Sequence, residues 1–210
     1  MATKAGSVID AWAEVAQNAI RIGDDTTSVA ADVAMNLLID VALVTTTAHT
    51  GTKVIVQVSE ETSGDGTWST LEEFISKTGT AVVDTLNATE PIGETTLAMD
   101  NPASSGLDND GKFKFIEHTT PANSEIVYQV SNTGDASDTI TIAFGLTNQQ
   151  DTNSQVFDFD DATAEAVLQK VVPLPPSVSR VRVIYNNKFD PDGSAVFTRA
   201  RLANMSDAAA

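Results

Sequence analysis

The carboxylates around residues 108–117 are the first candidates for chemistry, as a calcium site. Asp108, Asp110, Gly111 and Glu117 match positions 3, 5, 6 and 12 of an EF-hand loop, but position 1 would be Gly106. The flanking sequence predicts no helices, and Glu117 lies in an alternating run that predicts a strand. A turn rich in Asp, Asn and Gly is the favoured interpretation, with calcium as the alternative. The sequence therefore predicts no metal site.

Nucleophilic catalysis would need a histidine held between a nucleophile and an acidic residue. The two histidines, His49 and His118, both lie beside threonines in expected loops. The chain has no Gly-x-Ser-x-Gly motif, no glycine-rich phosphate-binding motif and no cysteine. Paired carboxylates for glycoside hydrolysis remain an alternative, although only two Trp and two Tyr are present to line a sugar cleft. We predict a protein without catalytic residues or a cofactor.

Four arginines at alternate positions near the C-terminus form the strongest pattern in the chain. They are Arg180, Arg182, Arg199 and Arg201. They lie in two alternating runs, 179–185 and 195–202, separated by nine residues rich in turn formers. This pattern predicts a β-hairpin with a long loop. If Tyr185 pairs with Val196, the four arginines share one face of the hairpin, with Arg182 opposite Arg199.

Such an arginine face needs carboxylates against it, because like charges directly opposite each other on a sheet are unfavourable. It is either a solvated surface or a docking face for an acidic surface, on the same chain or on a neighbouring copy. Trp12 is a further candidate contact, because a terminal segment with a Trp and several apolar residues is usually held against something. The predicted interface residues are Arg180, Arg182, Arg199, Arg201 and Trp12.

The elements expected to position these residues are strands. Apolar residues make up 41% of the 210 residues, and Val, Thr, Ala and Ser are abundant, which favours sheet. Long strands are expected at 35–44, 53–59 and 68–76, with Trp68 closing the end of a sandwich core. Beyond Gly79 the strands become shorter and evenly spaced, with turn residues between them, which is typical of a small barrel or sandwich.

The predicted fold class is all-β: a β-sandwich with an inserted small β-barrel or sandwich domain and an N-terminal arm. Helical spacing and strand alternation both fit the first 30 residues, and we interpret them as a partly extended arm. The predicted divisions are an arm at 1–30, a sandwich at 31–78 plus 164–205, an inserted domain at 79–163 and a tail at 206–210.

The net charge of −17 is distributed unevenly. Residues 1–80 carry −7, residues 82–165 carry −13, and residues 166–210 carry +3. This balance disfavours partners with a nucleic-acid backbone or an anionic membrane surface, both of which attract clustered Lys and Arg. The N-terminus does not match a signal peptide, and no apolar run is long enough to span a bilayer. The acidic body suits docking onto a basic patch instead.

Several passages resemble virion structural proteins of tailed bacteriophages. The segment 64–71 (Gly-Asp-Gly-Thr-Trp-Ser-Thr-Leu) resembles a turn common in their β-sandwich proteins. Residues 109–117 and 123–128 are similar to a small β-module inserted in virion and tail proteins, and the run from Val181 to Asn187 is similar to their closing strands. The resemblance covers most of the chain and implies a structural protein without catalytic residues.

Within that family, the resemblance implies a capsid decoration or cement protein, made in the host cytoplasm and located in the virion. Its expected partners are the major capsid protein or neighbouring virion subunits, and a homotrimer is the expected oligomer. A neck or tail component is the alternative within the virion. A carbohydrate- or receptor-binding module is the alternative of another class, and it would need an exposed aromatic platform.

Overall fold

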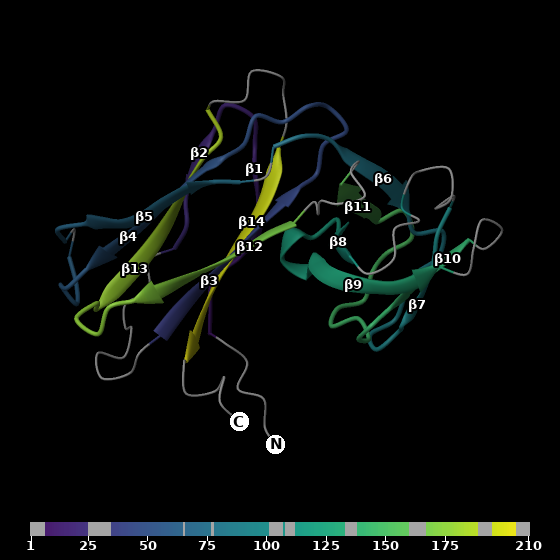
Figure 1. Cartoon of the computed structure of the whole chain (residues 1–210). Coiled ribbons are helices and arrows are strands. Elements are labelled where there is room, and N and C mark those ends of the chain that lie inside the picture. The colour runs from purple at the N-terminus through teal and green to yellow at the C-terminus, as the bar shows by residue number, and fades with distance from the viewer. Residues whose placement is uncertain are drawn as a thin grey trace.

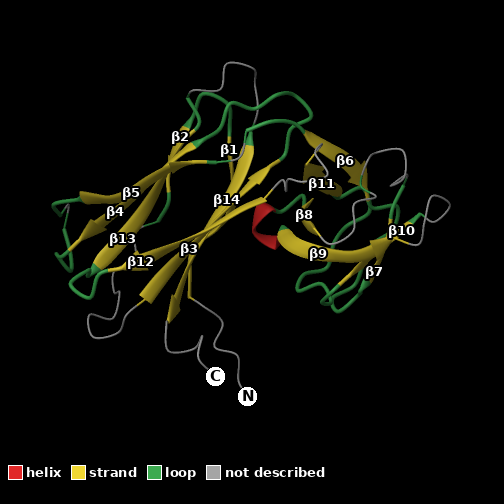
Figure 2. Ribbon diagram, in the orientation of Figure 1, coloured by secondary structure: helices red, strands yellow, loops and turns green. Residues whose placement is uncertain are grey.

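The computed structural model describes residues 7–24, 35–64, 66–76, 78–100, 107, 112–132, 138–159, 167–188 and 195–204. The fold is all-β, as the sequence predicts. Within these residues there are three antiparallel sheets and a single 3₁₀ turn, η1 (Pro121–Asn123). Figure 2 shows the strands in yellow and the short helix in red.

Two four-stranded sheets pack face to face. The first, sheet I, has the order β1 (Ser7–Val15), β14 (Val196–Asn204), β3 (Met35–Leu43) and β12 (Val167–Leu174). The second, sheet II, has the order β2 (Ile20–Ile22), β13 (Arg180–Asn186), β4 (Lys53–Ser59) and β5 (Ser69–Ile75). Their alternating apolar residues meet in a buried core, which makes this part of the chain a β-sandwich.

The strands between residues 81 and 159 form a curved six-stranded sheet of their own, which we call the insertion sheet (Figure 1). Its order is β6 (Ala81–Thr85), β11 (Gln155–Phe159), β8 (Lys112–Glu117), β9 (Glu125–Asn132), β10 (Thr139–Ile142) and β7 (Thr96–Ala98). It encloses a second apolar core that includes Leu97, Ile116 and Ile140. The chain leaves the sandwich after β5 and returns to it with β12.

The predicted arginine hairpin is wrong. β13 pairs with β2 and β4 in sheet II, whereas β14 pairs with β1 and β3 in sheet I. The residues that alternate with the arginines on these two strands are all buried, and they meet across the sandwich core. They are Val181, Val183, Tyr185, Val196, Thr198, Ala200 and Leu202. Alternation fixes which side chains point inward, but it does not tell whether two strands are neighbours or face each other.

The N-terminal segment is extended over residues 7–15 and 20–22, but these residues do not form an arm that leaves the body. They are β1 and β2, which supply an edge strand to sheet I and to sheet II respectively. The turn between them contains Asn18 with a positive φ of 53°, a conformation that Asn tolerates better than most residues. In the core, Arg21 of β2 pairs with Asp10 of β1 and so connects the two sheets.

Trp68 does not close the core: it is half-buried and lies beneath two arginines of sheet II. Asp108 and Asp110, the first part of the possible calcium loop, lie outside the described residues, as do the sequence ends 1–6 and 205–210.

Candidate interaction surface

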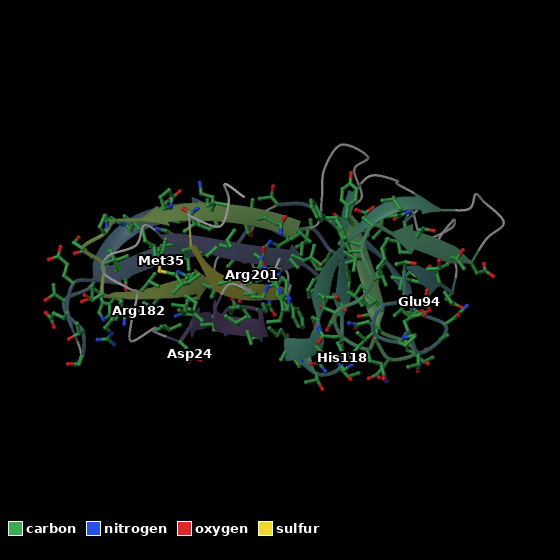
Figure 3. All side chains as sticks on the ribbon, turned by 90° about the horizontal axis from the view of Figure 1, so that it is seen from below. Asp24, Met35, Glu94, His118, Arg182 and Arg201 are labelled. Atoms are coloured by element: carbon green, nitrogen blue, oxygen red, sulfur yellow. The ribbon has the colours of Figure 1, made fainter. Side chains whose placement is uncertain are left out.

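The four predicted arginines are divided between the two outer faces of the sandwich. Because the neighbouring residues of β13 and β14 point into the core, Arg180 and Arg182 project outward from sheet II, and Arg199 and Arg201 project outward from sheet I. Figure 3 shows Arg182 and Arg201 well separated. Arg182 is therefore not opposite Arg199, and the expected single face of four arginines does not exist.

On sheet I, both arginines converge on one buried carboxylate, Asp40 of β3. Arg199 donates from Nε at 2.9 Å and from Nη2 at 2.7 Å to Asp40 Oδ2, and Arg201 Nη2 donates to the same oxygen at 3.1 Å. Gln169 of β12 donates to the other oxygen, Oδ1, at 3.1 Å. Asp40 is 1% exposed, so these hydrogen bonds replace its water shell. The carboxylate needed against the arginines comes from the chain itself.

Trp12 lies on the other side of Arg199. The Arg199 guanidinium carbon is 4.6 Å from the centre of the Trp12 ring, within the range of a cation–π contact. Burial lowers the pKa of Arg199, and the charge of Asp40 opposes that shift. An arginine remains charged in either case. Arg199 is thus fixed between a carboxylate and an aromatic ring.

Trp12 also marks where the insertion sheet rests on sheet I. Its ring centre is 4.8 Å from that of Phe115 of β8, which is 5.4 Å from Phe197 of β14. These three aromatic residues belong to the same core as the sandwich, together with Phe157 of β11. The sequence interpretation places Trp12 at an interface with other subunits, whereas in the structure it is 3% exposed and its contact is with the chain's own insertion.

The insertion covers only one end of the outer face of sheet I. Beyond Asp40 the register places four residues side by side across the sheet, one on each strand: Val8, Arg201, Leu38 and Val171. We call these four residues the open row. Val8 is 56% exposed and Val171 is 49% exposed. An outer sheet face usually carries polar residues, so an apolar row beside an arginine is a candidate contact surface.

On sheet II, the two other arginines hold a loop rather than form an open face. Their guanidinium carbons lie 5.0 Å (Arg180) and 4.2 Å (Arg182) from the Trp68 ring centre. Arg180 is buried and donates to the carbonyl oxygen of Gly64 at 2.6 Å, and Arg182 donates twice to Gln57 Oε1. These contacts fix the segment between β4 and β5 against β13.

A hollow of about 310 Å³ lies at the junction between β1 and the insertion. Its lining includes Glu14, Glu117 and His118. Burial raises the pKa of Glu117, and the nearby charge of Glu14 raises it further. His118 lies 3.2 Å from Asp151 through Nε2, and its Nδ1 accepts a hydrogen bond from the Thr120 amide. Both ring nitrogens are thus engaged with loop groups.

His49 has the same kind of environment inside the sandwich. Its Nδ1 accepts from the Gly51 amide at 2.8 Å, and its Nε2 lies 3.2 Å from Asn187 Oδ1. Asn187, which is fully buried, also accepts from the Thr52 hydroxyl and donates to the carbonyl of Ala16. This network ties the end of β13 to the turn after β1 and to the loop before β4.

Across the described parts of the chain, no three His, Cys, Asp or Glu side chains are grouped closely enough to hold a metal ion. The same residues include no helix with the length and apolarity needed to cross a membrane. No model of a known protein family matches the chain, and no curated protein matches it in sequence.

Asp40 and Phe115 are the key residues that the sequence interpretation did not select. Asp40 had a visible signal, because it is the only charge in the apolar run 35–44. A lone charge in a buried strand needs a partner, and the nearby arginines are the natural choice. Phe115 had no comparable signal, because its role depends on how the insertion rests on sheet I.

Proposed function

We propose that this protein is a non-enzymatic structural subunit of a tailed-phage virion, a cement protein that binds neighbouring subunits through the open row of sheet I. The observation that carries the proposal is the row of Val8, Arg201, Leu38 and Val171 across the outer face of sheet I, with half-exposed valines at both ends. Burying such a row against another subunit would remove apolar surface from water and would also give Arg201 a second acidic partner beside Asp40.

Charge complementarity favours a second copy of this chain as the occupant of the open row. Residues 82–165 carry −13, whereas residues 166–210, which include β14 and Arg201, carry +3. An acidic insertion on one copy and Arg201 in the open row of the next make a head-to-tail contact, and such contacts form closed rings when the rotation closes. A trimer is the expected ring, with each acidic insertion against the open row of its neighbour.

The test is a pair of substitutions on exposed residues, Val8→Glu with Val171→Glu. The variant should remain folded but lose the oligomer, measured by light scattering, and lose its occupancy on particles. The matched control is Ile75→Glu on β5 of sheet II, where Ile75 is 63% exposed. An unchanged oligomer in the double variant, or equal loss in the control, would contradict the proposed surface.

The number of copies per particle distinguishes a cement protein from a neck component. A cement protein should be present at on the order of hundreds of copies per particle, whereas a neck ring should have roughly six to twelve, as the symmetry of each assembly requires. Quantitative mass spectrometry of purified particles gives this number directly. A protein absent from particles would contradict both locations.

A receptor- or carbohydrate-binding role is the second candidate, and one feature of the insertion favours it. Ile92 is 69% exposed and Phe144 is 82% exposed, on adjacent loops joined by the Gly93 N to Leu146 O hydrogen bond of 2.9 Å. Gly145 allows this close approach, because a Cβ there would lie 2.6 Å from Gly93 O. Neither tryptophan offers a platform, since Trp12 is 3% exposed and Trp68 is stacked under arginines.

This second role is tested by glycan-array or cell binding of the wild type and of Phe144→Ala. Binding that is lost in the variant, with the oligomer unchanged, would favour recognition through the insertion over a cement role. Binding that is absent from the wild type would remove this candidate.

A further inference from the structure

The core of the insertion contains one lysine and one aspartate in direct contact. Lys114 of β8 and Asp158 of β11 form an ion pair, and both side chains are 0% exposed. Phe157 lies opposite Phe115 on these two strands, so Asp158 and Lys114 follow as the next directly opposite pair. The two functional groups are therefore held together by the backbone of adjacent strands.

The directly opposite neighbours of this pair are apolar, and one buried amide, Gln129 of β9, lies diagonally across from Lys114. The register places Val127 opposite Lys114 and Val82 opposite Asp158. On the same two strands and the same interior face, the next residues are Ile116 and Val156, both 0% exposed. A charge pair in such an environment has lost its hydration, and the attraction between the charges offsets this cost only with excellent geometry.

A second carboxyl group faces the same interior. Asp84 of β6 is buried and lies directly opposite Val156, which makes it the diagonal neighbour of Asp158. Diagonal neighbours on a sheet are separated by roughly 7–8 Å between Cα atoms, so the carboxyl groups of Asp84 and Asp158 face the same part of the interior. Asp84 Oδ1 accepts a hydrogen bond from the Thr85 amide, so the carboxyl group is held in place.

We propose that Lys114 and Asp158 are joined by an amide bond that the folded protein forms without another enzyme. Holding an amine and a carboxyl group in contact converts a bimolecular condensation into an intramolecular one. Exclusion of water from the core also protects the product from hydrolysis. The bond removes both buried charges, which the ion pair retains.

The reaction balances with the atoms of the two side chains alone. A proton passes from the Lys114 ammonium to a carboxylate, and the nitrogen lone pair then attacks Cγ of Asp158. The Cγ–O bond breaks, the oxygen leaves as water with two protons from the nitrogen, and Nζ keeps one hydrogen. No oxidant, reductant or co-reactant is consumed. Asp84 acts as the proton carrier, taking the proton from the nitrogen and delivering it to the leaving oxygen.

The experiment is mass spectrometry of the purified full-length chain under denaturing conditions. The intact mass should be about 18 Da below the sequence mass, the loss of one water. Lys112 and Lys170 are the nearest trypsin sites on either side, with Lys114 between them and no other Lys or Arg in that stretch. The linked protein should give peptide 113–170 uncut after Lys114 and lighter by one water. An intact mass equal to the sequence mass, with a free peptide 115–170, would overturn the proposal.

Two controls identify the bond. Succinimide formation at Asp-Gly sequences, such as Asp65-Gly66, also removes one water, but it leaves the cut after Lys114 intact. Lys53 faces Glu73 at 2.7 Å on the exposed surface, so cleavage after Lys53 should remain normal. Lys114→Arg retains a cation but not a nucleophilic amine, and it should abolish the mass loss.

Two aspartate variants test the chemistry. Asp158→Asn should still form the bond, with loss of ammonia, about 17 Da, in place of water. An Asp158→Asn protein with the full sequence mass would count against attack at Cγ. Asp84→Asn should slow the appearance of the linked form after refolding at least tenfold, with unchanged circular dichroism. Formation at the wild-type rate would remove Asp84 from the mechanism and leave the bond in place.

Discussion

The sandwich and the insertion each bury a carboxylate against a cation on the adjacent strand, but the two sites differ in how they are closed. On sheet I, Asp40 is opposite Arg199, and the arginine side chains remain 19% (Arg199) and 31% (Arg201) exposed. In the insertion, Lys114 and Asp158 are both 0% exposed. The same antiparallel geometry therefore produces an open cluster in one region and a sealed pair in the other.

The difference shows what each site is suited to do. A guanidinium has several donors in a fixed fork, so Arg201 retains hydrogen-bonding capacity that an approaching surface can use. A lysine enclosed by valine and isoleucine side chains has no access to solvent or to a partner protein. The open cluster is suited to contact with another subunit, and the sealed pair is suited to holding the insertion together.

The largest expected effect is from opening the sealed pair with Asp158→Ala. It leaves the Lys114 charge buried without its carboxylate, which costs about 3–5 kcal/mol for a buried pair. Loss of the proposed covalent loop adds about 4 kcal/mol if the chain-entropy relation for disulfides applies to it. Urea unfolding of the wild type and the variant measures the combined loss in the free energy of unfolding. The control is Glu73→Ala, which breaks an exposed pair and should cost less than about 1 kcal/mol. Equal costs for the two variants would show that burial does not distinguish them.

The next effect concerns the contact between the two regions. Phe115→Ala removes a fully buried ring from between Trp12 and Phe197 and should lower the free energy of unfolding by about 3 kcal/mol. Phe144→Ala, at a ring that is 82% exposed, should change it by less than about 0.5 kcal/mol. Two separate unfolding transitions in Phe115→Ala would show that the regions fold independently once this contact is lost.

The open cluster should be more tolerant of change than the sealed pair. Asp40→Ala removes the shared acceptor of Arg199 and Arg201, and we expect a loss of about 2 kcal/mol, the scale of hydrogen bonds to charged groups. The arginines can turn toward water, which limits the cost. Asp40→Asn retains a carbonyl oxygen for Arg199 and should lose less. A cost for Asp40→Ala as large as that of Asp158→Ala would contradict the distinction between open and sealed sites.

Much of the fold followed from local patterns. The strand expected at 53–59 coincides with β4, and the alternating run that contains Glu117 is β8, because alternation and turn residues depend on the local chain. The long strand expected at 35–44 is β3 (Met35–Leu43), which has sheet II on one side and is partly covered by the insertion on the other. These features needed no knowledge of which strands are neighbours.

Strand pairing did not follow from local patterns. The runs around Arg182 and Arg199 have the same inward-facing alternation whether they form a hairpin or lie in opposite sheets. Their pairing is determined by the rest of the sandwich, because β13 pairs with β4 in sheet II and β14 pairs with β3 in sheet I. Strand pairing also determines the candidate surface. Arg180 and Arg182 hold a loop of sheet II, whereas the open row on sheet I includes Val8 and Val171, which are more than 150 residues apart in sequence.

The smallest expected effect is on the dependence of stability on pH, and it compares a carboxyl group in the junction with one at the surface. Burial and the charge of Glu14 raise the pKa of Glu117 above its ordinary value of 4.5. The folded state then holds this proton more tightly than the unfolded state, so stability falls as the pH rises from 4.5 through the raised pKa. Glu117→Gln should remove that loss and unfold at higher urea than the wild type at about pH 7, with the advantage gone at about pH 3.5.

The surface carboxyl group Glu94 should show the opposite sign. Its pKa is lowered by hydrogen bonds from the amides of Thr96 and Thr95. A lowered pKa gives stability that is present above the ordinary value of 4.5 and is lost as the pH falls through the folded-state value. Glu94→Gln should therefore be slightly less stable than the wild type at about pH 7 and equal to it at low pH. Urea titrations of both variants at the two pH values should give differences of opposite sign. Shifts in the same direction would mean that the junction does not bury Glu117 in solution.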